Sequence, residues 1–195
     1  MNEYFSPNLT ITLDCIRMLH EPSTISFERE SMYSEPLITL LRSAFSRARQ
    51  KRHEYVTVEH MLLILLYSSS VKELLRACDA DVYALRASLT IFIEKHMPTV
   101  PDGADKLDKL RCDDQKLIFN HTVYGVLYDI AVPTRSLQCV IQHAFLRALL
   151  TPKMEQVREV ELLLSIFNDR ASHAVYFLHE QGVTRQQVDA YLRRE

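Results

Sequence analysis

The sequence contains very little glycine, 3 residues in 195, against an average of about 7% in proteins. It has no tryptophan, and no apolar run approaches the ~18 residues that a membrane-spanning helix needs. Asn2 and Glu3 open the chain without the basic segment of a secretory signal peptide. Few turn formers among many Leu, Ala, Arg and Glu residues favour helices. We therefore expect an all-α, soluble and cytoplasmic protein.

The charges and the cysteines exclude further classes of function. Lys and Arg total 23 against 25 Asp and Glu, so no basic excess indicates a nucleic-acid partner. Cys15, Cys78, Cys112 and Cys139 share no CxxC or other metal-ligand spacing. Reduced and mostly buried thiols are typical of a cytosolic protein with such cysteines. We expect no metal and no cofactor.

A helix is predicted to begin at Ser34, because Ser is a good N-cap and Pro36 costs little in a first turn. Apolar residues then recur at spacings of 0, 3, 4, 7, 8 and 11, which is one buried helical stripe. The basic residues at 47–52 are expected to form a solvent-exposed helix face. The apolar stripe consists of Leu37, Leu40, Leu41, Ala44, Phe45 and Ala48.

A second helix is predicted to follow a short charged elbow, His53-Glu54, which we expect on the surface. Thr57 is its N-cap, and Glu59 in the first turn opposes the positive end of the helix dipole. Two further helices are expected, over 71–78 and from Asp81, as N-cap, to the stop at Pro98. The buried stripe of the second helix consists of Val58, Met61, Leu62, Leu65 and Leu66.

The same pattern recurs one hundred residues later. Ala44-Phe45-x-Arg47-Ala48 matches Ala144-Phe145-x-Arg147-Ala148, within a stripe over 137–148 that has the same spacing. Val58-Glu59 then has its counterpart in Val160-Glu161, and Thr184 has the place of the capping Asp81. This pattern indicates an internal duplication of a four-helix unit, with the two copies packed face to face into one eight-helix domain.

The duplication divides the chain into four segments. Residues 34–98 and 134–195 are the two repeats. Residues 1–33 form an extension, in which 9–13 suit a short strand or an extended arm while 15–19 could begin a helical turn. Residues 99–133 form a middle insert, polar at first, with a turn or two of amphipathic helix expected in 123–130.

The segment from Ala44 to His60 closely resembles the N-terminal domain of the Clp (Hsp100) AAA+ unfoldases, and the ClpA branch is nearest. The likeness continues to Glu94, and the second half resembles the second repeat of that family (the double Clp-N motif) more weakly. The resemblance implies a domain that docks adaptors or substrates for an ATP-driven unfoldase and its peptidase. The alternative is a free-standing homologue, repurposed as a structural or adaptor subunit of a larger assembly.

Catalysis is not expected of these 195 residues. Glycine occurs only at positions 103, 125 and 182, so the Gly-x-x-x-x-Gly-Lys phosphate loop is absent from them. No Ser/His/Asp, Cys/His or paired-carboxylate arrangement has a recognisable local context either.

The resemblance also implies the residues that bind partners. In the ClpA branch the adaptor ClpS contacts acidic residues that match Glu54 and Glu59, and His53 lies beside them. In the ClpC branch, glutamates that match Glu59 and Glu161 bind phosphoarginine, but Val58 and Val160 replace the threonines of that branch, which argues against this ligand here. The competing interpretation is that first-turn glutamates only oppose the helix dipole.

A zinc site at His53 and His60 is a further alternative for this region. The two histidines lack the tighter His-x-x-x-His spacing that zinc sites usually have. We therefore interpret both as incidental surface histidines.

Overall fold

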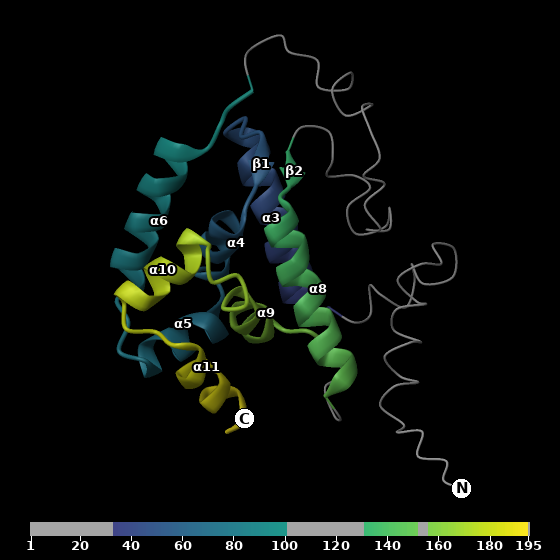
Figure 1. Ribbon diagram of the computed structural model, residues 1–195, viewed down its shortest axis with the longest axis vertical. Coiled ribbons are helices and arrows are strands. Elements are labelled where there is room, and N and C mark those ends of the chain that lie inside the picture. Colours follow the sequence, from purple (N-terminus) through teal and green to yellow (C-terminus); the bar gives the residue numbers. More distant parts are fainter. Residues whose placement is uncertain (1–32, 101–130, 152–155, 195) are drawn as a thin grey trace, which may run out of the picture.

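A computed structural model describes residues 33–100, 131–151 and 156–194 (Figure 1). These residues form eight helices, so the predicted all-α class is confirmed, and they add two strands of two residues each. The predictions for the extension and the middle insert lie outside the described residues, as do Cys15 and Cys112. Among the described cysteines, Cys78 is half-buried and Cys139 is exposed, so the expectation of buried thiols was wrong for Cys139.

The first repeat starts where Ser34 caps a helix, its hydroxyl accepting from the amide of Leu37 at 3.3 Å. Its last helix starts where the Asp81 carboxylate accepts from the amides of Tyr83 and Ala84, at 2.9 and 3.0 Å. Both caps agree with the sequence prediction. The elements are α3 (Glu35–Gln50), β1 (Tyr55–Val56), α4 (Val58–Leu65), α5 (Ser69–Ala77) and α6 (Val82–His96).

The second repeat copies the first. Its first helix has 16 residues, like α3, and the Thr134 hydroxyl accepts from the amide of Leu137 at 3.3 Å as Ser34 does in the first repeat. The predicted duplication is therefore present in the helix order and in the capping. The elements are β2 (Val132–Pro133), α8 (Arg135–Leu150), α9 (Glu159–Ile166), α10 (His173–Glu180) and α11 (Arg185–Leu192).

Each repeat pairs its leading backbone with the other repeat. The amide of Ser34 donates to the carbonyl of Val157 at 3.0 Å, and the amide of Thr134 donates to the carbonyl of Val56 at 2.9 Å. The second of these bonds belongs to the parallel pairing of β1 with β2, in which Tyr55 lies opposite Val132. The two reciprocal bonds give the domain an approximate two-fold symmetry and tie the repeats together by main chain.

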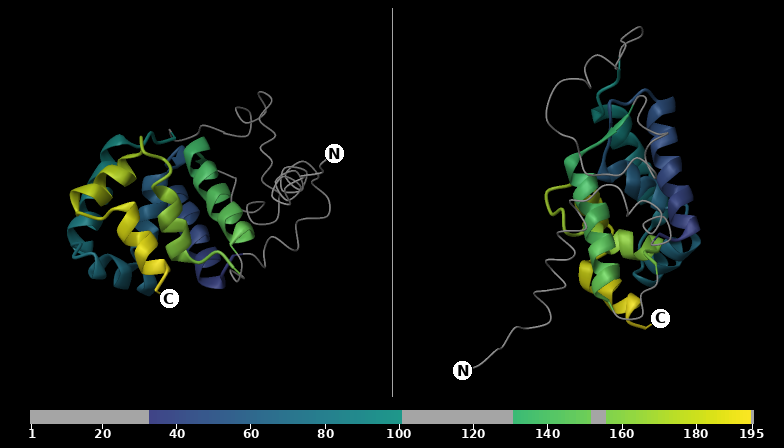
Figure 2. Two further views of the ribbon diagram at one scale, coloured as in Figure 1. Left: turned by 60° about the horizontal axis from the view of Figure 1, so that its bottom comes forward. Right: turned by 90° about the vertical axis from the view of Figure 1, so that its right-hand side faces the viewer.

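Helices α4 and α9 form the centre of the molecule (Figure 1). Helix α4 contacts α3, α6, α8, α9 and α10, and α9 contacts α4, α5, α8 and α11. Figure 2 (left) shows α9 between α8 and α11, with α10 against α6. All eight residues of α4 are buried, so the single apolar stripe predicted for this helix was too narrow. A helix enclosed on every side is mostly apolar, and the two polar residues of α4, Glu59 and His60, form hydrogen bonds within the domain.

The capping of α4 and α9 corrects the predicted alignment of the repeats. Thr57 and Arg158 are the N-caps of these helices, and Leu66 and Phe167 are their C-caps. Glu161 therefore occupies the position of His60, three residues after the cap, and not that of Glu59. The sequence match of Val-Glu with Val-Glu is displaced by one residue from the structural match.

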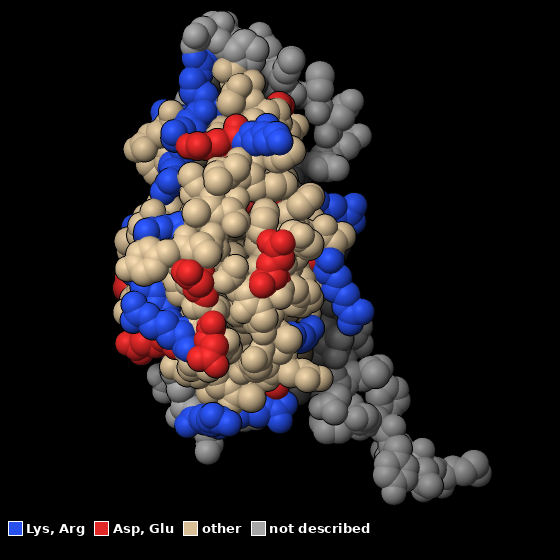
Figure 3. Space-filling view, turned by 90° about the vertical axis from the view of Figure 1, so that its left-hand side faces the viewer, with Lys and Arg blue, Asp and Glu red and all other residues tan. Residues whose placement is uncertain are grey.

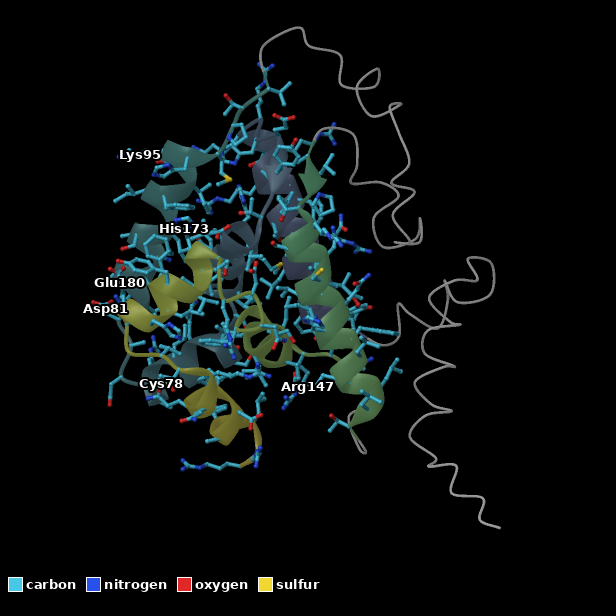
Figure 4. The ribbon with its side chains drawn as sticks, viewed as in Figure 1. Cys78, Asp81, Lys95, Arg147, His173 and Glu180 are labelled. Atoms are coloured by element: carbon cyan, nitrogen blue, oxygen red, sulfur yellow. The ribbon has the colours of Figure 1, made fainter. Side chains whose placement is uncertain are left out.

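Aromatic side chains join α6 to α10 across the repeats. The ring of Phe92 lies 4.4 Å from that of His173 and 5.6 Å from that of Phe177, centroid to centroid. His173 lies at the start of α10 (Figure 4). These contacts pack α6 of the first repeat against α10 of the second.

Candidate partner-binding site

The elbow between α3 and α4 is held by backbone bonds on both sides. Arg52 has a left-handed backbone (φ 56°), and the amide of His53 donates to the carbonyl of Ala48 at 2.9 Å, which ends α3. The amide of Glu54 donates to Pro98 at 2.8 Å, and its carbonyl accepts from Val132 at 3.2 Å. The elbow is thus hydrogen-bonded on one side to the chain that follows α6 and on the other to β2, and its position is fixed.

The side chains at the tip of the elbow are Glu54, which is half-buried, and Tyr55, which is 39% exposed. A side-chain hydrogen bond to Glu54, followed by the charge of that carboxylate, raises the pKa of the Tyr55 phenol. The two residues therefore form one polar unit, with an acidic and an aromatic group accessible together.

His53 lies inside, not on the surface as predicted. It is 5% exposed, and its Nδ1 lies 2.8 Å from Nε2 of His60, which is 3% exposed. The amide of Thr57 donates to Nδ1 of His60 at 3.2 Å, so the proton of the neutral His60 ring is on Nε2 and is donated to His53. The interpretation of both as incidental surface histidines was therefore wrong, because the elbow folds onto α4 and buries the two rings together.

Burial governs the protonation of this pair. Burial, followed by the charges of His53 and Arg47, lowers the pKa of His60 to about 3. Burial and the charge of Lys51 lower the pKa of His53, against an opposing effect of Glu94. Both rings are therefore neutral near pH 7. They stabilise the base of the elbow through the hydrogen bond that joins them.

Glu59 points into the interface between the repeats. Its side chain is 7% exposed, and its Oε1 accepts from the amide of Ala174 at 3.3 Å, in the first turn of α10. A carboxylate at a helix N-terminus satisfies a free amide and opposes the dipole. Glu59 therefore opposes the dipole of α10, in the other repeat, and not only that of its own helix α4.

Glu161 is buried as well, at 2% exposure. Its Oε2 accepts from the amide of Arg158 at 3.0 Å, and its Oε1 accepts from the guanidinium of the same residue at 2.9 Å. Glu161 therefore caps its own helix, as the third residue of a capping box does.

Four residues were predicted to bind a partner. The structure leaves Glu54 partly exposed at the surface and buries the other three, His53, Glu59 and Glu161.

Within residues 33–100, 131–151 and 156–194, no three His, Cys, Asp or Glu side chains come close enough to hold a metal ion. None of the described helices combines the length and the apolar character needed to cross a membrane.

A surface that the sequence analysis missed runs along the outer face of α3. A groove of ≈ 850 Å³ lies between α3 and the end of α4, with Arg42, Arg47 and Lys51 on its rim and no acidic residue in its lining. The basic run was interpreted as an ordinary solvated face, because the groove forms only where Ile64 of α4 and Tyr67, which follows α4, pack beside α3.

Comparisons with known proteins identify the domain. Residues 32–111 match the Clp repeat (R) N-terminal domain. Over these residues the chain carries a Clp N-terminal repeat domain. A ClpA homolog protein of Fuscovulum blasticum is 30% identical over 153 residues, which are 78% of this chain and 16% of that protein. The chain thus spans about a sixth of this relative, and the resemblance inferred from the sequence is confirmed.

Solved structures share the fold of this chain across both repeats. The N-domain of ClpV from Vibrio cholerae has a TM-score of 0.55 at 17% identity, covering 83% of this chain and 82% of that one. A chain from a study of the ATPase ClpV, the TssB-TssC sheath and the accessory HsiE protein has a TM-score of 0.60 at 15% identity, covering 89% and 91%. A chain from a malarial protein secretion system has a TM-score of 0.62 at 17% identity, covering 84% and 93%.

Proposed function

We propose that this Clp N-terminal repeat domain docks adaptor or substrate proteins for an AAA+ unfoldase and its peptidase, and that it performs no chemistry itself. The observation that supports this proposal is the fixed elbow, which presents the Glu54 carboxylate beside the exposed Tyr55 ring. An acidic group next to an aromatic ring suits a Lys or Arg of a partner, through a charge-assisted hydrogen bond and ring contact.

His53, Glu59 and Glu161 have supporting positions in this proposal. His53 holds the base of the elbow through His60, and Glu59 fixes α4 against α10. Glu161 fixes the start of α9, so that the backbone at Val157 meets Ser34. Their contribution to binding is the rigidity of the surface, because a preorganised surface loses less conformational entropy on binding.

The test is calorimetric titration of the full chain with a purified ClpS-type adaptor. Glu54→Lys is expected to raise the Kd by about tenfold or more, because it reverses the charge of a half-buried carboxylate within the contact. Glu73→Lys, an equal change at an exposed position of α5, is the matched control and leaves the Kd unchanged. An unaltered Kd in Glu54→Lys, with a normal thermal melt, contradicts the assignment of the elbow.

Glu59 requires a different substitution. Lys at this buried position would leave a charge without a partner at the start of α10 and is expected to unfold the domain. Glu59→Gln keeps an oxygen acceptor for the amide of Ala174, so it separates a binding role from a structural one. If Glu59 acts only through the fold, Glu59→Gln retains the wild-type Kd.

A second candidate function is that of a structural subunit in a larger assembly, and it rests on the secretion-related proteins that share the fold. Deletion of residues 1–32 leaves Tyr33 and its bridge to Val157 intact. Loss of co-purifying partners on this deletion, with normal partner capture by Glu54→Lys, favours the structural role. The opposite pattern favours docking through the elbow.

A further inference from the structure

The groove along α3 lies beside an arginine whose counterpart in the second repeat is neutralised. In the second repeat, Nη2 of Arg147 lies 3.0 Å from Oδ1 of Asp189, so an arginine of α8 pairs with a carboxylate of α11. Arg147 extends from α8 on the side of α11 (Figure 4). Arg193 also binds Asp189, at 2.7 Å. Burial alone would raise the pKa of Asp189, but the hydrogen bonds and charges of the two arginines lower it.

The first repeat has arginine at both of these positions. Arg47 corresponds to Arg147, because α3 and α8 begin one hundred residues apart. Arg86 corresponds to Asp189, because each is the fifth residue after the N-cap of the last helix of its repeat, Asp81 and Thr184. The position that supplies the carboxylate in one repeat therefore supplies a second positive charge in the other.

Tyr67 lies between these two arginines. Nη1 of Arg47 donates to the phenol oxygen at 3.4 Å, and the Arg86 guanidinium carbon lies 5.6 Å from the ring centroid and 5.4 Å from that of Tyr83. Within the described part of the chain, neither arginine forms an ion pair. The nearby Asp81 carboxylate is engaged in capping α6.

The surroundings extend this positive charge. Lys72 and Arg76 line a smaller hollow of ≈ 210 Å³ together with Arg86, next to the groove. Lys and Arg side chains follow one edge of the face shown in Figure 3. The hydrogen bond from Arg47 is the largest effect that lowers the pKa of Tyr67, and the charges of Arg47 and Arg86 act in the same direction. The lining of the groove itself thus contains no acidic residue, and the acid of the smaller hollow, Asp81, is engaged in capping α6.

We propose that this groove docks an acidic helical segment of a partner protein, and that a carboxylate of the segment binds between Arg47 and Arg86 as Asp189 binds Arg147. The charge of the groove is complementary to such a segment. Arginine binds carboxylates with charge-assisted, often bidentate hydrogen bonds. An amphipathic helix lying in a groove is a common mode of peptide recognition. The arginine end of the groove lies at Tyr67, after the end of α4, whereas the elbow precedes the start of α4. Binding there adds to the docking proposed above.

A protein segment fits the groove better than a nucleic acid does. Leu40, which is half-buried, and the buried Ile64 give the groove an apolar floor, while hydroxyl groups of α3 line its side. Its volume is within the range of sites that bury a ligand. The chain as a whole carries a net charge of −2, which does not favour a phosphate backbone.

The test measures the fluorescence anisotropy of a labelled amphipathic peptide that has leucine on one face and glutamate on the other. We expect Arg86→Asp to weaken binding by about tenfold or more, because it recreates within the chain the ion pair of the second repeat. The same peptide with glutamine for glutamate should bind the wild-type chain equally weakly. Arg135→Asp, at an exposed position of α8, makes the same change in net charge and should leave binding unchanged.

Several outcomes overturn the proposal. These are equal binding by Arg86→Asp, equal losses in Arg86→Asp and Arg135→Asp, and no binding of the acidic peptide up to about 1 mM. Tighter binding of a labelled oligothymidine, also lost in Arg86→Asp, assigns the groove to nucleic acid instead. If Arg86→Asp does not fold, Arg86→Gln replaces it, and peptide-induced amide shifts in the wild-type chain must map to α3 and Tyr67.

Discussion

The two repeats share one backbone but satisfy it with different side chains. Both first helices are capped by a hydroxyl, from Ser34 or Thr134. The second helices differ, because the amide of the N-cap donates to a histidine ring in one repeat and to a glutamate in the other. The outer faces differ as well, with Arg47 and Arg86 in one repeat where the other has Arg147 and Asp189. The two repeats therefore share their main-chain hydrogen bonds and differ in the charged side chains of their outer faces.

The largest expected effect of this difference is on acid stability. Because the pKa of His60 in the folded state, about 3, lies below its unfolded value of 6.5, the unfolded chain binds more protons between these pH values. Stability is therefore complete above pH 6.5 and falls as the pH is lowered, by on the order of 3 kcal/mol at about pH 4. Urea unfolding at a series of pH values measures this loss.

His60→Gln isolates the ring from other acid effects. Glutamine keeps an acceptor for the amide of Thr57, as the third residue of a capping box, but it does not titrate. This variant should lose much less stability on acidification than the wild type, while His143→Gln, at an exposed position of α8, should follow the wild type. Equal acid sensitivity of His60→Gln and the wild type would show that the His53–His60 pair does not determine it.

The next largest effect is expected at Glu161. Glu161→Ala removes the acceptor for the amide of Arg158 and the ion pair with its guanidinium, and should cost about 2 kcal/mol in the free energy of unfolding. Glu161→Gln keeps one acceptor oxygen and should cost less than half of that. Chemical denaturation at pH 7 checks both, and equal losses would mean that the charge, not the cap, matters.

A smaller effect is expected at the left-handed residues that end the third helices. Gly182 (φ 73°) follows α10 as Asp79 (φ 57°) follows α5, and in both repeats the next amide donates to the carbonyl five residues back. Gly182→Ala should cost about 1 kcal/mol although its Cβ would meet nothing within 4 Å, because the cost is in the backbone. Asp79→Gly should stabilise by a few tenths of a kcal/mol. Thermal unfolding measures both variants, and stability changes of the same sign in the two would contradict this account.

The smallest effect separates the ion pairs of the two repeats. Asp189→Asn weakens the partly buried pair with Arg147 and should cost about 0.5–1 kcal/mol. Glu94→Gln breaks a pair with Lys51 whose side chains are both 54% exposed, and it should change stability by less than about 0.5 kcal/mol. Thermal melts of the two variants, measured side by side, compare these losses of stability. A larger loss in Glu94→Gln than in Asp189→Asn would contradict the predicted order.

The sequence was sufficient for the helices and their duplication, because these depend on local signals. Apolar spacing located α3 and α8, and the caps at Ser34, Asp81 and Thr184 located helix starts within a residue. The exchanged backbone pairing was not predictable, since two-residue strands have no periodic signal. The boundaries proposed for the four segments stay predictions.

The candidate site was less predictable, because its contacts join residues that are distant in the sequence. Glu59 meets Ala174, which is 115 residues away, and only this contact explains why a first-turn glutamate is buried. The family pattern indicated Glu54 and Glu59 together, but the fold separates them into one accessible and one enclosed carboxylate. The two arginines at Tyr67 become informative only when position 86 is compared with position 189.

The most direct test of the central claim, that the first repeat docks partners through its elbow, is an NMR titration of the isotope-labelled chain with a ClpS-type adaptor. The account predicts that amide shifts concentrate at Glu54 and Tyr55 and at the paired backbone amides of Thr99, Val100 and Val132. It also predicts that the start of α9, around Glu161, stays unchanged. Shifts concentrated in the second repeat, or none at saturating adaptor, would contradict it.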